Sequence, residues 1–149
     1  MALCTLEPAF AQPSTVQLTE HASFPPLTFG STETLAVNLA NTASNPATGA
    51  AASCTGSVSF HNASGALIGS ATSFTLSSGQ ISAVTLPFSS AGSSGPHAGV
   101  QATITVTPAT TSPRPPCNLV FSLEITDISS GATHAVVTSQ AAGITLVGR

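Results

Sequence analysis

Residues 117–125 read CNLVFSLEI, and this stretch decides the fold class. Apolar residues occupy every second position from Cys117 to Ile125, with mostly polar residues between them. Side chains alternate between the two faces of a β-strand, so a period of two predicts a strand with one face in the core. Residues 54–60, CTGSVSF, follow the same pattern and place Cys54 at the parity of the apolar residues.

The two cysteines of these strands are therefore expected to point into one core. Cys54 and Cys117 lie 63 positions apart, and a bond between them would stabilise the fold by about 4 kcal/mol in the chain-entropy model. We predict an intradomain Cys54–Cys117 disulfide; two buried free thiols are the alternative. Cys4 is left over, either in a leader or in a bond between chains.

Period-two alternation recurs along the rest of the chain, and no stretch has sustained helical periodicity. Turn residues separate the runs, and residues 108–116 hold four prolines, which excludes a central strand there. The pattern predicts an all-β, two-sheet antiparallel β-sandwich of about 9–10 strands. The predicted strands include 27–29, 35–39, 56–60, 66–68, 74–76, 81–88, 100–106, 117–126 and 132–138, and the predicted loops are 41–53, 89–99 and 108–116.

Charged residues make up only 5% of the chain, against about 25% in a typical soluble domain. The sequence contains no lysine, and its only cations are Arg114 and Arg149. Nucleic-acid binding and attachment to an anionic membrane both need clustered basic residues, so both are excluded as partners. Low net charge gives little repulsion between copies, which favours self-association into a homo-oligomer or polymer.

The N-terminal residues predict export. Ala9 and Ala11 form an A-x-A pattern that places a cleavage site before Gln12. We interpret residues 1–11 as the remnant of an export signal or a flexible leader, and residues 12–149 as one sandwich domain. No apolar run approaches the roughly 18 residues that span a bilayer, so we expect a secreted protein, extracellular or at the cell surface, with no membrane span.

A resemblance follows from two turn motifs and their neighbours. Residues 60–69, FHNASGALIG, and residues 76–80, LSSGQ, follow a Phe29-Gly30 pair and a strand at 35–39 that runs into Asn41-Thr42. This order resembles immunoglobulin-like (Ig-like) modules of bacterial exported proteins, and in particular small secreted β-sandwich proteins. The similarity covers most of residues 27–138. It implies an Ig-like sandwich and leaves the activity open.

The sequence holds no recognisable catalytic or metal motif. Glu124 and Asp127 lie three apart on one strand, so they should face opposite sides and form no acid–base pair. There is no Gly-x-Ser-x-Gly elbow, and one aspartate cannot build a calcium loop. No two histidines have metal-ligand spacing, although a site assembled across strands stays open. We predict no enzyme, no metal and no cofactor; the remaining titratable residues are Glu7, Glu20, Glu33, His21, His61, His97 and His134.

Two classes of function fit these properties. The first is a structural subunit of a surface fibre, filament or coat that assembles through strand edges. Its candidate donated strand is Thr15, Val16, Gln17, Leu18 and Thr19, which would add to a neighbouring copy; the alternative is that this segment is the sandwich's own first strand.

The second class is a monomeric adhesion module that binds carbohydrate or protein through its long loops. The chain has no Trp and no Tyr on which a sugar ring could stack. Asn62-Ala63-Ser64 matches the glycosylation acceptor pattern, so Asn62 is a candidate modification site, and a plain hairpin turn is the other interpretation.

Overall fold

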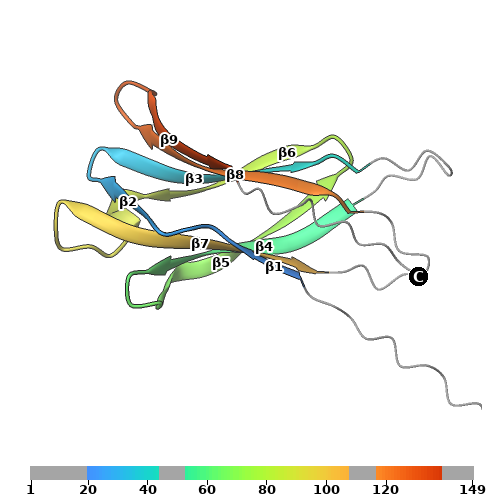
Figure 1. Cartoon of the computed structure of the whole chain (residues 1–149), viewed down its shortest axis with the longest axis horizontal. Helices are drawn as coiled ribbons and strands as arrows, with labels where there is room; N and C mark the ends of the chain where they lie inside the picture. The colour runs from blue at the N-terminus through green and yellow to red at the C-terminus, as the bar shows by residue number, and fades with distance from the viewer. Residues whose placement is uncertain (1–19, 44–52, 108–116, 139–149) are drawn as a thin grey trace, which may run out of the picture.

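Nine β-strands form two antiparallel sheets that pack face to face in the computed structural model, which describes residues 20–43, 53–107 and 117–138 (Figure 1). Sheet A has the order β1-β7-β4-β5, and β2 also pairs with β7; sheet B has the order β6-β3-β8-β9. The strands are β1 (Glu20–Ser23), β2 (Leu27–Gly30), β3 (Glu33–Asn41), β4 (Ser53–Asn62), β5 (Leu67–Ser77), β6 (Ile81–Pro87), β7 (His97–Thr107), β8 (Leu119–Asp127) and β9 (Thr133–Thr138), and a short 3₁₀ helix covers Phe88–Ser90. The predicted two-sheet sandwich is confirmed.

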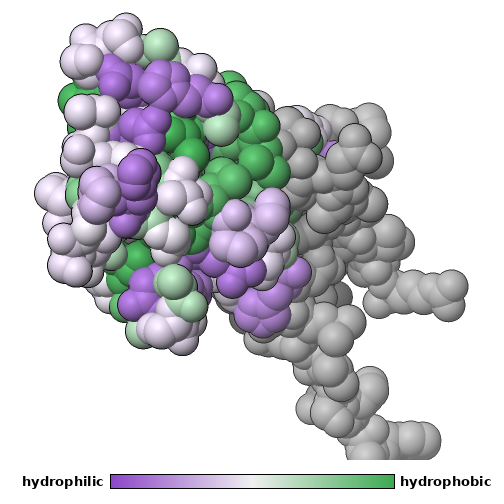
Figure 2. Space-filling model, turned by 60° about the vertical axis from the view of Figure 1, so that its left-hand side comes forward, coloured by the Kyte–Doolittle hydropathy of each residue, from purple (hydrophilic) through white to green (hydrophobic). Residues whose placement is uncertain are grey.

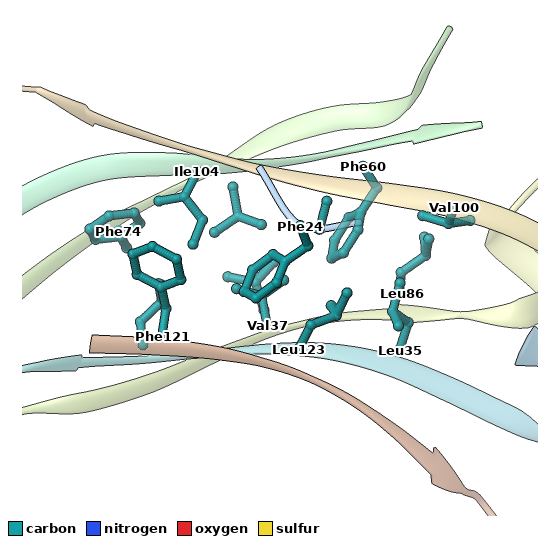
Figure 3. Packing of buried hydrophobic residues seen from close by; sticks show 14 of the residues in the cluster. Phe24, Leu35, Val37, Phe60, Phe74, Leu86, Val100, Ile104, Phe121 and Leu123 are labelled. Atoms are coloured by element: carbon teal, nitrogen blue, oxygen red, sulfur yellow. The ribbon is translucent and has the colours of Figure 1, made fainter. Parts of the chain in front are cut away.

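The core lies between the sheets and is filled from alternate positions of their strands (Figure 3). In β7 and β8 every second residue is buried, as the period-two pattern predicts. Phe24 and Phe121 meet edge to face across the core, with ring centroids 5.6 Å apart. Val37 and Leu123 are fully buried beside them. The packed faces of both sheets therefore come from the residues that the alternation selects.

The Cys54–Cys117 disulfide joins the two sheets, as predicted. Cys54 belongs to β4 in sheet A, and Cys117 lies two residues before the start of β8 in sheet B. Both residues are buried, and their Cα atoms are 5.2 Å apart. The bond closes the sandwich at one end of the core and holds the two layers at a fixed separation.

Several strands differ from the sequence prediction. The separate strands expected at 66–68 and 74–76 belong to one continuous strand, β5. The exposed residues between them carry no apolar alternation, so the pattern did not predict a strand there. β7 starts at His97, so the loop expected at 89–99 is shorter. β1 is an additional strand, and the expected strand at 81–88 ends one residue early, where Phe88 enters the 3₁₀ helix. The candidate strand at 15–19 and the loops 44–52 and 108–116 lie outside the described residues.

Candidate functional site

The outer face of sheet A is built from hydroxyl side chains. In register across three strands, Thr55 of β4 lies between Thr107 of β7 and Thr75 of β5, and Ser57 lies between Thr105 and Ser73. The outward positions of these three strands carry no charged residue. A surface of this kind offers hydrogen-bond donors and acceptors without charge.

Two histidines border this hydroxyl face. His21 Nδ1 lies 3.1 Å from Thr105 Oγ1, and His61 Nε2 lies 3.3 Å from Thr103 Oγ1. Both imidazoles are therefore held by threonines of β7. In the part of the chain that the structure describes, no three His, Cys, Asp or Glu side chains are grouped to hold a metal ion.

The outer face of sheet B carries an apolar row at one end. Ala40 of β3 pairs with Ile81 of β6 on one side and with Val120 of β8 on the other, so the three residues lie side by side. Ile81 is 78% exposed and Val120 is 55% exposed. Figure 2 presents the opposite end of the molecule, where hydrophobic surface gathers between hydrophilic patches. An exposed apolar row that reaches a sheet edge is a feature of association surfaces.

Three of the four sheet edges carry features that block pairing with another strand. Pro25 and Pro26 interrupt the edge formed by β1 and β2. The β5 edge is shifted in register against β4, and Gly69 within it has a φ of 67°. The β9 edge is shifted in register against β8 near His134. Bulges of this kind twist an edge away from a straight partner strand.

The fourth edge, β6, pairs with no described strand other than β3, and we call such an edge open. All seven of its residues, Ile81–Pro87, pair with β3 in unbroken register. The strand has no charged residue, and only Pro87, at its last position, lacks a backbone N–H. Its outward residues Ile81, Ala83 and Thr85 are exposed. We call Ile81–Pro87 the β6 edge, and it is the candidate functional site.

Glu124 and Asp127 accept hydrogen bonds from neighbouring residues at a strand end and in a turn. Asn38 Nδ2 donates to Glu124 Oε2 at 3.0 Å, and Thr133 Oγ1 donates to Glu124 Oε1. These two bonds, Thr133 first, lower the pKa of Glu124. Asp127 accepts bonds from the residues of its own turn. The β3 partner of Glu124 is Ala36, whereas Asp127 lies opposite Glu33, and the charge of Asp127 acts against the lowering of the Glu33 pKa.

One cross-strand pair was missed in the sequence. His134 Nδ1 lies 2.6 Å from Glu33 Oε1, although the residues are 101 positions apart. The Gly30 N–H donates to Glu33 Oε2, and this bond, followed by the one to His134, lowers the pKa of Glu33. The pair ties β9 to the β2–β3 turn. Prediction of this pair requires the strand order, because β8 lies between β3 and β9 in the sheet.

Asn62 occupies the turn between β4 and β5. Its Oδ1 accepts bonds from the backbone N–H groups of Ser64 and Ala66 and from the Ser64 hydroxyl, at 2.7–3.0 Å. These bonds are the ones expected of a hairpin turn. Glycosylation of Asn62 stays a prediction. A shallow hollow beside the turn is lined in part by Asn62, Ser93 and His97.

The described ranges contain no helix long and apolar enough to cross a membrane. The candidate donated strand, Thr15–Thr19, lies outside the described residues. The described residues define a class: a disulfide-closed all-β sandwich in which one sheet edge carries no blocking feature. No protein-family model, curated protein or solved structure matches the chain.

Proposed function

We propose that this chain is a non-enzymatic structural protein outside the cell, a subunit of a surface fibre, filament or coat whose copies associate through strand edges. The open β6 edge carries the proposal. An unguarded edge presents a row of unpaired backbone N–H and C=O groups, which another strand can pair with. The other edges of the described sheets carry blocking features, so association has one preferred place.

The charge content supports self-association. β6 and the outward positions of its neighbour β3 from Thr34 to Ala40 carry no charge, so two copies meet there without like-charge repulsion. The apolar row Ile81–Ala40–Val120 adds area that association would remove from water. Both the backbone and the side chains at this edge therefore favour a partner strand.

The disulfide supports the extracellular location. Disulfides form and persist in oxidising compartments and are rare in the cytosol. Cys54–Cys117 is buried in the core and closes a long loop, which is the pattern of a structural bond. The Ig-like resemblance of the sequence fits an exported module of this kind.

The test measures the mass of the purified full chain over a range of concentrations by light scattering after size-exclusion chromatography, with negative-stain electron microscopy of the same fractions. We expect oligomers that grow with concentration. Ala83→Lys places a charge on the β6 edge and should shift the population to monomer. Thr75→Lys, on an exposed position of the β5 edge, is the matched control and should leave assembly unchanged. A chain that stays monomeric at every concentration would contradict the proposal.

A second candidate, a monomeric adhesion or ligand-binding module, is favoured by the hollow beside the β4–β5 turn. Asn62, Ser93 and His97 offer it polar groups, while Ala91 and Ala98 are buried at its wall. A monomer in the scattering experiment, together with specific retention on a glycan or protein array that His97→Ala abolishes, would favour this function over assembly.

A further inference from the structure

The register of β1 against β7 indicates which residues the segment before β1 would face if it continued along β7. β1 pairs antiparallel with β7, and Glu20 lies opposite Val106. In the same register, residues 16–18 would face residues 108–110, at the start of a stretch with four prolines. Because proline lacks the N–H that a ladder needs, this sequence disfavours the alternative that residues 15–19 extend the sandwich's own first strand along β7.

The β6 edge has the complementary pattern. Val84 and Leu86 are its core-facing residues and retain 8% and 6% exposure at the rim of the core. In an antiparallel pairing with Leu18 opposite Val84 and Val16 opposite Leu86, four apolar side chains share the inner face. The polar residues of the segment then lie on the outer face: Thr19 beside Ala83, Gln17 beside Thr85 and Thr15 beside Pro87.

We propose that residues Thr15–Thr19 of one copy add as an antiparallel strand to the β6 edge of a neighbouring copy. This inference rests on the proposed assembly function and names the two surfaces that meet. The donating and accepting surfaces differ, so the contact is head-to-tail and can repeat from copy to copy, as an open filament or a closed ring. Neither surface carries a charge, which leaves backbone hydrogen bonds and apolar burial to hold the contact.

A copy cannot make this contact with its own edge. Gln17 lies three residues before Glu20 and reaches about 10 Å from it. β1 and β6 lie at opposite sides of the sandwich, with β7, β4 and β5 on the way through sheet A. Three strand spacings within the sheet, combined at right angles with one sheet separation, place the two strands roughly 17 Å apart. Pairing of Gln17 with Thr85 therefore reports a contact between two copies.

Disulfide cross-linking in the full chain tests the inference. Gln17→Cys and Thr85→Cys are introduced together in a Cys4→Ser background, so that the native Cys54–Cys117 bond is kept. Directly opposed residues of antiparallel strands lie within disulfide distance. The matched control combines Gln17→Cys with Thr75→Cys, an equally exposed threonine on the β5 edge. Each single-cysteine variant accounts for cross-links between identical positions.

We expect a ladder of cross-linked species on a non-reducing gel, at roughly tenfold the yield of the control pair because pairing holds the two sulfurs together. Mass spectrometry should identify a peptide linked through positions 17 and 85. If oligomers form and are lost in Ala83→Lys but no 17–85 link appears, the inference is overturned while the proposed function stands. Preferential linking to position 75 also overturns it. A chain that is always monomeric overturns both.

Discussion

Gly56 shows at the scale of one residue how tightly the core is packed. It holds an inward position of β4 between Cys54 and Val58. A Cβ added there would lie 2.2 Å from the Thr105 carbonyl oxygen and 2.7 Å from the Phe74 ring. The glycine therefore lets the Phe74 ring and the β7 backbone approach the β4 backbone closely.

Replacement of this glycine should be costly. We expect Gly56→Ala to lower the free energy of unfolding by about 3 kcal/mol, because the backbone of β7 cannot move aside without breaking its ladder. Gly99→Ala is the matched control, since its added Cβ meets only the Ala63 Cβ at 3.9 Å. Urea denaturation of both variants checks this. Equal midpoints for the two would show that the core has room at Gly56.

Asp127 is the second residue with a measurable consequence. Its Oδ1 accepts bonds from the Ser129 hydroxyl at 2.6 Å and from the N–H and hydroxyl of Ser130 at 2.9 Å. These bonds, Ser129 first, hold the pKa of Asp127 well below its usual range. The folded state thus favours the ionised carboxylate.

The sign of the pH dependence follows from that lowered pKa. The stabilisation is fully present above the pKa of the unfolded chain, about 3.9, and is lost as the pH falls through the folded value. We expect melting temperatures of the wild type to fall between about pH 5 and pH 2, and those of Asp127→Asn to fall less over the same interval. Parallel curves for the two proteins would assign the acid sensitivity to Glu33 and Glu124 instead.

At the scale of elements, the hairpin between β4 and β5 depends on one side chain. Asn62 Oδ1 organises the turn, and Gly65 takes a φ of 82° within it. Asn62→Ala should lower the free energy of unfolding by about 1–2 kcal/mol, because two backbone N–H groups lose their acceptor.

A second variant separates this structural role from modification. Ser64→Ala destroys the acceptor pattern for glycosylation but leaves both backbone bonds to Asn62. It should cost less stability than Asn62→Ala in thermal unfolding. If Asn62 carries a glycan in the protein from its native cell, the intact mass of both variants should fall by the mass of that glycan. A mass change explained by the substitution alone would show that Asn62 serves the turn only.

The sequence predicted the interior elements better than the edges. β3, β7 and β8 lie inside the sheets or face the core along their length, so strict alternation marks them. The first half of β5 has both faces exposed, so its residues do not alternate between apolar and polar. The pattern therefore did not predict that β5 is one continuous strand. The Cys54–Cys117 bond was predictable because both cysteines share the parity of core residues.

The candidate site was harder to predict. Which strands lie at a sheet edge depends on the strand order, and the order joins segments far apart in the chain, such as β3 with β8. The amino-acid pattern of residues 81–87 does not distinguish an edge strand from a strand that is paired on both sides. The Glu33–His134 pair was missed for the same reason.

For the whole molecule, the disulfide is the strongest single constraint between the layers. Cys54→Ala together with Cys117→Ala should lower the free energy of unfolding by about 4 kcal/mol, since the loop between the two residues becomes free in the unfolded chain. Chemical denaturation checks the value. The reduced wild type, which lacks the bond but keeps both side chains, is the control for cavity effects. An unchanged midpoint in the double variant would show that the core alone fixes the sheet separation.

The strand order has a consequence for the timing of folding. His21 of β1 meets Thr105 of β7, 84 positions later in the chain, and Asn38 of β3 meets Glu124 of β8, 86 positions later. When such a chain emerges from its amino end, its earliest strands wait without neighbours until most of the remainder has been released. Collapse is thereby delayed, and acquisition of the native state becomes a slow step that follows completion of the chain.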